Sequence, residues 1–462
     1  MLFRSNFSLP TPKRRLGASI FLSFLSLSSI YYFLCDRASV GTRLQKISEA
    51  TGLGGYTGIW KWGDGDGLEV DEEGSGEAVN LVVFGDSWVD DTPQSGQSGR
   101  GKSWARVVCE EIHCSSYTSF AATQPSDAYP ANPPTGVMAS NAVYRKALEQ
   151  SRSGSMTNQT DLLPDLGSQI QSFIGGKQSA VRDSRETIFV LSLGFWEVYH
   201  YASMEFEFAE STTDSAVDGL FDQIELLYRH AVNNTSTTAQ QLESNSSTPA
   251  NAPVFRVMIP KLIDPSITPG WLTHRPVPLK PSSIAEQQKN AAYLTSRWNL
   301  RVENKMIQWM KSNSIENEAP ETPEGSPDVT QDPRESQFLE KDFYYYNVAR
   351  QVLDMIVEHQ LEKTGISDAS GLGKGSSPFK RVQTPCLSES QLHEDLGENF
   401  DELNGYLLCK TPDEYMFWDA FNIGSVAKRS IGSGAATMIS GGHSLRARLS
   451  KSYSNNDAAN NP

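Results

Sequence analysis

A run of four apolar residues at 81–84, stopped by Gly85 and followed by Ser87, constrains the fold more than any other feature of the chain. An apolar run this short, bounded by a turn residue, predicts a buried strand. Four further segments predict strands, at 116–122, 187–193, 254–260 and 343–346. A serine just beyond the first strand would lie at the edge of an open α/β sheet where such folds hold their chemistry. A polar turn without further function is the alternative interpretation of residues 85–87 alone.

Amphipathic segments separate the predicted strands. We expect helices at 103–112, 137–150, 161–174, 215–231, 282–311 and 348–361, the first of them capped by Ser103. Strands that alternate with helices favour a mostly parallel sheet between two helical layers. The sequence therefore predicts an α/β chain with a three-layer α/β/α domain built on a five-stranded sheet.

The N-terminal 35 residues predict a targeting segment. Residues 1–15 end in the basic cluster 13–15, and the 20 residues from 16 to 35 carry no charge. Twenty residues at 1.5 Å each span the hydrocarbon core of a bilayer, and a basic flank on the amino side predicts a cytoplasmic N-terminus. We expect a single-pass anchor at 16–35, a flexible tether at 36–79 and a lumenal or extracellular domain. A cleaved signal peptide on a secreted chain is the alternative.

Sequons and cysteines agree with a secretory location. Acceptor triplets for N-linked glycans occur at Asn158, Asn233, Asn234 and Asn245. Apart from Cys35 in the predicted anchor, four cysteines allow three pairings, and we expect the local ones, Cys109–Cys114 and Cys386–Cys409. None of them has metal-ligand spacing with histidine, so no metal and no other cofactor is expected.

Composition sets the boundaries of the domain and excludes one class of function. The net charge of −15 argues against a nucleic-acid-binding protein, which would present a basic face. Hydrophobic residues make up 38% of the chain, so part of it should be disordered. We expect the domain at 80–430, with disordered inserts near 232–252, 312–336 and 365–380 and a disordered tail at 431–462.

Several segments together resemble the GDSL or SGNH hydrolases, in particular their secreted fungal-type branch. Residues 85–87 (Gly-Asp-Ser) resemble the nucleophile block, residues 193–197 (Leu-Gly-Phe-Trp-Glu) the Gly-x-Asn-Asp block, and residues 412–422 the last block, in which an Asp and a His complete a triad. Residues 262–265 add a match after the fourth strand. The resemblance covers residues 80 to about 430 and implies a flavodoxin-like sheet.

The same resemblance implies site residues and exposes departures from the family's pattern. It implies Ser87 as nucleophile and Asp419 as its acid partner, with Asp86, Gly194, Trp196 and Glu197 around the oxyanion and the cleft. Asn422 stands at the family's histidine position, and its amide cannot accept a proton near neutral pH. Trp196 stands at the oxyanion asparagine. Residues 102–135 contain no glycine, so the second block lacks its usual N–H donor.

Two functions follow from these matches and departures. The first is an acyl-ester hydrolase of the secretory pathway, acting on an acylated glycan or another ester. The second is a catalytically silent relative that binds a glycan or a protein partner in the same cleft. Loss of a triad base costs roughly 10⁶ in turnover in the subtilisin series, so the exchange at Asn422 decides between them.

Overall fold

The computed structural model describes residues 79–91, 98–123, 136–151, 162–176, 186–242, 254–277, 283–315, 339–365, 377–389, 400–403 and 406–449. The elements discussed below all lie in one compact unit, Gly65–Ala447. The predicted anchor at 16–35, the tether to residue 78 and the sequons at Asn158 and Asn245 lie outside the described residues.

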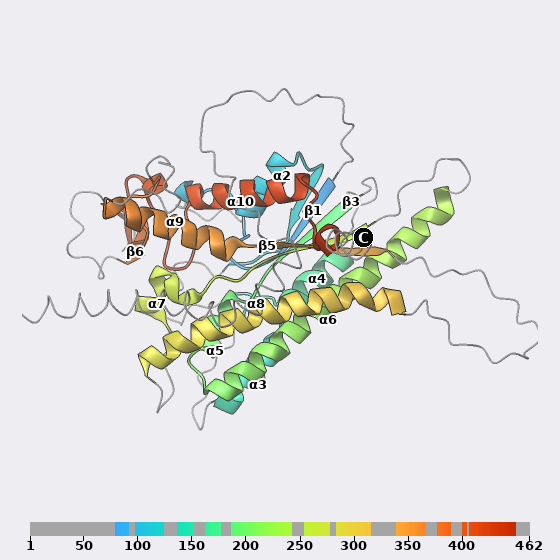
Figure 1. Cartoon of the computed structure of the whole chain (residues 1–462), viewed down its shortest axis with the longest axis horizontal. Helices are drawn as coiled ribbons and strands as arrows, with labels where there is room; N and C mark the ends of the chain where they lie inside the picture. The colour runs from blue at the N-terminus through green and yellow to red at the C-terminus, as the bar shows by residue number, and fades with distance from the viewer. Residues whose placement is uncertain are drawn as a thin grey trace, which may run out of the picture. The chain divides into compact units, whose positions relative to one another are not determined.

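A five-stranded parallel sheet forms the centre of the domain, as the alternation of strands and helices predicts (Figure 1). Its strand order is β2-β1-β3-β4-β5, and each neighbouring pair is parallel. The strands are β1 (Val79–Gly85), β2 (Ser116–Ser119), β3 (Glu186–Ser192), β4 (Val254–Pro260) and β5 (Glu340–Tyr346). β1 and β3 are central and almost wholly buried, which explains why they are continuous apolar runs rather than alternating ones.

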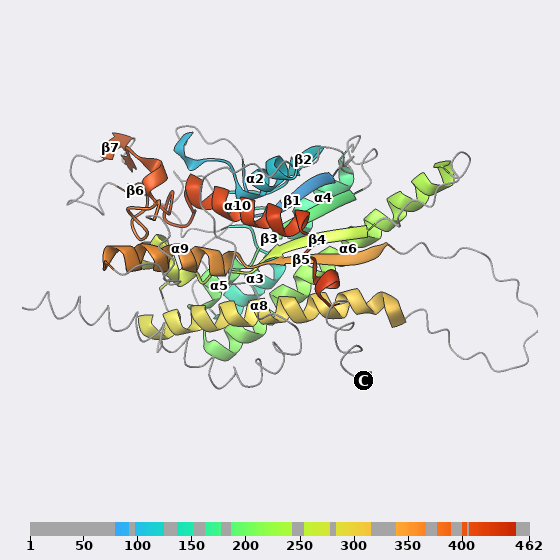
Figure 2. The ribbon, with the colours of Figure 1, turned by 45° about the horizontal axis from the view of Figure 1, so that its top comes forward.

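Helices cover both faces of this sheet (Figures 1 and 2). One layer holds α2 (Trp104–Glu111), α9 (Val348–Lys363) and α10 (Ser425–Ser440). The other holds α3 (Asn141–Ser151), α4 (Leu166–Gly175), α5 (Phe195–Tyr201), α6 (Phe206–Leu242) and α8 (Ile284–Ile315). The short helix α7 (Pro269–His274) follows β4. Ser103 caps α2 as predicted, since its Oγ accepts from Arg106 N at 3.2 Å.

A small antiparallel sheet that the sequence did not predict lies between the last α/β unit and α10. Its strands are β6 (Leu387–Glu389), β7 (Phe400–Leu403) and β8 (Tyr406–Cys409), in the order β6-β8-β7. The predicted disulfides Cys109–Cys114 and Cys386–Cys409 are both present, and the second joins β8 to the residue before β6. Both confirm the expected pairing.

Two predictions of disorder are wrong where helices continue. α6 covers residues 232–242 of the predicted insert at 232–252, so Asn233 and Asn234 lie on an exposed part of this helix, and residues 243–252 lie outside the described residues. Extending an established helix adds one hydrogen bond per ordered residue, which lets weak helix formers follow a packed segment. α8 likewise continues to Ile315, past the predicted start of the next insert.

The prediction of a disordered tail at 431–462 is wrong for residues 431–440, because α10 continues to Ser440; residues 450–462 lie outside the described residues. Its Gly, Ser and Ala residues are a packing surface rather than low-complexity sequence. A Cβ on Gly432 would lie 2.5 Å from Cβ of Val107 in α2, a distance that real Cβ atoms essentially never show. Small residues therefore let α10 pack closely on α2.

Candidate active site

Ser87 lies in a turn directly after β1, and two backbone features shape this turn. Gly85 has φ of 142°, and a Cβ there would lie 2.3 Å from the Ser192 carbonyl oxygen of β3. The Gln169 side chain of α4 holds the same residue from the other side. Gly85 N donates to Gln169 Oε1 at 2.8 Å, and Gln169 Nε2 donates to Gly85 O at 3.0 Å. The strand therefore ends at a fixed point, and Ser87 follows at the carboxyl edge of the sheet.

Asp86 supports this turn from inside the protein. Its side chain is buried, and Oδ1 accepts a hydrogen bond from Trp88 N at 3.0 Å. Burial raises the pKa of Asp86 to about 7, and the nearby charges of Glu197 and Asp90 add to this rise although the Trp88 N–H opposes it. Asp86 therefore stabilises the turn that carries Ser87 from the interior of the protein.

The Ser87 side chain has no hydrogen-bond partner among the described residues. It is 4% exposed, and its buried Oγ is unpaired. Its backbone carbonyl is held, because Arg100 Nη2 donates to Ser87 O at 3.0 Å. Lys428 of α10 in turn donates from Nζ to Arg100 O at 3.2 Å. The serine is therefore positioned through its backbone while its hydroxyl remains unengaged.

The block after β3 stands beside the serine turn. Gly194 caps α5 with φ of 108°, where a Cβ would lie 2.4 Å from the Trp298 ring. Trp196 is buried, and its Nε1 has no partner among the described residues. A Cβ on Gly136 would lie 1.9 Å from that Nε1, so the indole edge lies against the glycine backbone. Gly136 is one residue beyond the glycine-free segment and was not singled out from the sequence.

Glu197 is a second buried carboxyl at this edge of the sheet. Its Oε1 accepts from Ala139 N at 2.5 Å, and its buried Oε2 has no partner among the described residues. Burial raises the pKa of Glu197 to about 7 against the opposing effect of its backbone hydrogen bonds. Glu197 ties the chain at residue 139 to α5.

Asp419 and Asn422 form a closed hydrogen-bonded pair in the last loop. Asn422 Nδ2 donates to both carboxylate oxygens of Asp419, at 3.0 Å to Oδ1 and 2.8 Å to Oδ2. Phe421 N and Asn422 N also donate to Oδ1, at 2.9 and 2.7 Å. Both side chains are buried, and Asn422 Oδ1 has no partner in the described part of the chain. Asp419 is therefore paired with the residue three positions on, the one that stands at the family's histidine position.

This loop packs against the block after β3 and the helix after β4. The Phe421 ring lies 5.1 Å from the Trp196 ring and 6.3 Å from the Phe195 ring, measured between centroids. The Phe195 ring in turn lies 5.9 Å from that of Trp88, next to the serine. The three sequence blocks therefore meet at one edge of the sheet, although Ser87 Oγ makes no hydrogen bond to Asn422 or Asp419.

The disulfide and the small sheet hold the other side of the loop. Cys386 N donates to Phe417 O at 3.0 Å, and Leu387 N donates to Trp418 O at 2.7 Å. Cys386, Cys409, Tyr415 and Trp418 form a buried cluster. The backbone just before Asp419 is thus bonded to the cysteine bridge.

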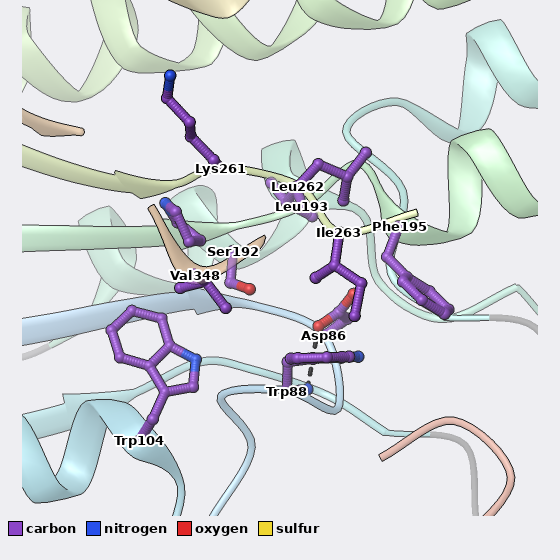
Figure 3. A pocket seen from close by; sticks show the side chains of 11 residues that line it. Asp86, Trp88, Trp104, Ser192, Leu193, Phe195, Lys261, Leu262, Ile263 and Val348 are labelled. Atoms are coloured by element: carbon purple, nitrogen blue, oxygen red, sulfur yellow. Dashed lines mark hydrogen bonds between the residues drawn. The ribbon is translucent and has the colours of Figure 1, made fainter. Parts of the chain in front are cut away.

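A small apolar cavity lies next to the serine turn (Figure 3). It holds about 20 Å³, room for roughly one water. Asp86, Trp88, Trp104 and Phe195 line it together with residues at the ends of β3 and β4 and with Val348, the first residue of α9, as Figure 3 shows. It is too small for an acyl ester, so an ester would have to approach Ser87 from elsewhere.

Besides Gly136, three residues of the site were not found from the sequence: Gln169, Arg100 and Lys428. Lys428 is buried, and desolvation lowers its pKa to about 7, with the Arg100 charge acting in the same direction and the aspartates 419, 91 and 90 against it. Each of the three makes its contact with a segment distant in sequence, and no local pattern marks such a residue.

Among the described residues no group of three or more His, Cys, Asp or Glu side chains could hold a metal ion.

Burial of Lys428 has a measurable effect on stability. Its folded pKa lies below the unfolded value of 10.5, so between pH 7 and 10.5 the unfolded chain binds one more proton than the folded one. The free energy of unfolding should therefore rise with pH over this range, by up to about 1.4 kcal/mol per unit. Lys428→Met should remove this rise in urea unfolding at a series of pH values. The exposed Lys289→Met serves as control, and a Lys428→Met variant that keeps the wild-type slope would contradict the assignment.

No protein-family model matches the chain, and no curated protein matches it. In the described residues no helix is both long and apolar enough to cross a bilayer.

Proposed function

We propose that the chain carries an SGNH/GDSL-like domain that acts on acyl esters through Ser87, with a degenerate triad. The strand order β2-β1-β3-β4-β5 agrees with a flavodoxin-like sheet, in which ligands bind where the strand order reverses, between β1 and β3. Ser87 follows β1, and Trp196 follows β3. The observation that carries the proposal is this position, together with a buried Ser87 hydroxyl that no described residue engages.

In this reaction Ser87 Oγ attacks the acyl carbon, the ester C–O bond breaks, and the alcohol leaves with a proton. Water then hydrolyses the acyl-serine. The serine proton needs a base, and the Asn422 amide is not basic enough to take it near neutral pH. Trp196 Nε1 is an unpaired donor beside the site, but it faces Gly136 rather than holding the position of an amide side chain. We therefore expect slow turnover.

A second candidate is a silent domain that binds a glycan or protein partner. The specific observation in its favour is the Asp419–Asn422 pair. The Asn422 amide bonds both oxygens of the carboxylate that would orient a base, which gives a stable arrangement without any catalytic role. In this case the unpaired Ser87 hydroxyl contacts ligand without reacting.

Location belongs to the same proposal. Two disulfides support folding in an oxidising compartment, and the basic cluster before residues 16–35 supports a single-pass anchor with the domain in the lumen or outside the cell. An acylated glycan or another ester of that compartment would be the substrate.

A fluorophosphonate probe separates the two candidates, because it reacts only with an activated serine. We expect the purified full-length chain to label slowly at Ser87, and Ser87→Ala to remove the label. Ser119→Ala, which changes an exposed serine at the end of β2, should label like the wild type. If the folded chain stays unlabelled after long incubation, the hydrolase proposal is rejected and the proposal of a binding domain remains.

A further inference from the structure

Three exposed aliphatic side chains lie on and after α7, at the carboxyl edge of β4. Leu272 is 75% exposed, Val277 86% and Ile284, in the first turn of α8, 53%. Gln287 Nε2 donates to Pro276 O at 2.7 Å, which ties the segment after α7 to the start of α8. We call Leu272, Val277 and Ile284 the apolar rim. Large aliphatic groups gathered in one segment mark a contact surface more often than scattered ones do.

The apolar rim is fixed to the last loop of the candidate site. Gly270 N donates to Ala420 O at 2.6 Å, one residue after Asp419. A Cβ on Gly270 would lie 2.4 Å from the Phe421 ring, so α7 and this loop are in tight contact. Tyr199 OH donates to the His274 carbonyl oxygen at the end of the helix. Trp271 is buried, 6.1 Å from the Tyr199 ring between centroids, while its neighbour Leu272 faces solvent.

The charge of this segment is opposite to that of the chain. Residues 265–285 contain no Asp or Glu and include Arg275 and Lys280, in a protein of net charge −15; Asp264 and Glu286 stand on either side of this stretch. Exposed aliphatic groups next to basic residues are the pattern of elements that lie in a membrane interface, where the basic groups contact lipid phosphates. A second exposed apolar pair in the described residues, Phe206 and Tyr293, stands among acidic residues such as Glu205 and Glu210 and lacks this complementarity.

We propose that the apolar rim docks on a phospholipid bilayer, with Leu272, Val277 and Ile284 in the interface and Arg275 at the level of the phosphates. A membrane anchor at 16–35 would keep the domain within reach of such a surface. Docking would turn the edge of the sheet that carries Ser87 and Asp419 toward the membrane. The proposal concerns where the domain lies and does not depend on whether Ser87 reacts.

Fluorescence from single labelled positions tests this docking. The full-length chain with Cys35→Ser and Val277→Cys carries an environment-sensitive dye at 277 and is reconstituted into phosphatidylcholine vesicles, with and without phosphatidylserine. We expect a blue-shifted emission that nitroxide-labelled lipids quench, more strongly with phosphatidylserine. Leu300→Cys is the matched control: it replaces an aliphatic residue, 61% exposed, that lies 16 residues beyond Ile284 on α8, about 24 Å along the helix.

The same samples give the results that decide the proposal. Adding Leu272→Asp and Ile284→Asp should abolish quenching at 277, with circular dichroism reporting the fold. The proposal would be overturned if nitroxide-labelled lipids did not quench the dye at position 277, or quenched it no more than the dye at position 300. A blue shift that follows protein concentration without lipid would assign the rim to a second copy of the chain instead. Ser87→Ala should leave the quenching unchanged, so this result is separate from the esterase test.

Discussion

Replacing Asn422 with histidine is expected to raise hydrolysis of a short acyl ester by about 10²-fold or more. The Asn422 amide already donates to both Asp419 oxygens, and an imidazole at this position could donate from Nδ1 in the same way. Its Nε2 would then be free to act as the base that takes the proton of the Ser87 hydroxyl, which has no hydrogen-bond partner among the described residues. The rate should stay well below that of a full triad, because the oxyanion donors at Trp196 and in the second block remain altered.

Steady-state rates of four variants check this expectation. Asn422→Gln keeps an amide and should give no gain. Asn422→His combined with Asp419→Asn should lose most of the gain, because the imidazole is no longer oriented by a carboxylate. If Asn422→His changes nothing while Ser87→Ala abolishes a measurable wild-type activity, the base lies elsewhere and the comparison of residues 412–422 with the last family block is wrong.

Removing the Cys386–Cys409 bridge should cost about 3 kcal/mol of folding free energy in the chain-entropy model. The two cysteines are 23 residues apart, so the bridge restricts a substantial loop in the unfolded chain. In the folded chain Cys386 N donates to Phe417 O, and the bridge is part of the buried cluster with Trp418. Cys386→Ser with Cys409→Ser should therefore loosen the loop that carries Asp419 as well as lower stability.

The second disulfide provides the control for this loss. Cys109 and Cys114 are only 5 residues apart, so Cys109→Ser with Cys114→Ser should cost less, about 2 kcal/mol. Urea unfolding followed by far-ultraviolet circular dichroism measures both. Equal losses, or a larger loss at Cys109–Cys114, would show that loop closure does not govern the effect. Serine variants at 386 and 409 that match the wild type would reject a stabilising role of the bridge.

The central sheet was predictable because local sequence marks its strands. Residues 81–84 and 187–193 are apolar runs that stop at Gly85 and Gly194, and both glycines adopt positive φ where the chain turns out of the sheet. The Asp419–Asn422 pair was also predictable, since a carboxylate and an amide three residues apart in one turn can meet without help from the rest of the fold. In both cases short-range geometry sufficed.

The rest of the site depends on contacts between distant segments. Gln169 is a lone polar residue on the apolar face of α4, and only the folded sheet shows that it holds Gly85. Arg100 and Lys428 are ordinary cations in sequence, yet both are buried beside the serine turn. The glycines of α10 suggested disorder in the sequence. Their role is to let α10 approach α2 closely, and this can be recognised only when the partner helix is known.

The contact between α10 and α2 also determines when the domain can complete its folding during synthesis. Lys428 of α10 follows its partner Arg100, which lies just before α2, by 328 residues. A ribosome that adds about 5–20 residues per second needs roughly a quarter of a minute to a little over one minute for that interval. Throughout this time the face of α2 that carries Val107 lacks its cover, whatever the earlier strands have done. Until α10 has been synthesised, the nascent chain therefore exposes apolar surface on α2, and intermediates of this kind are prone to aggregate.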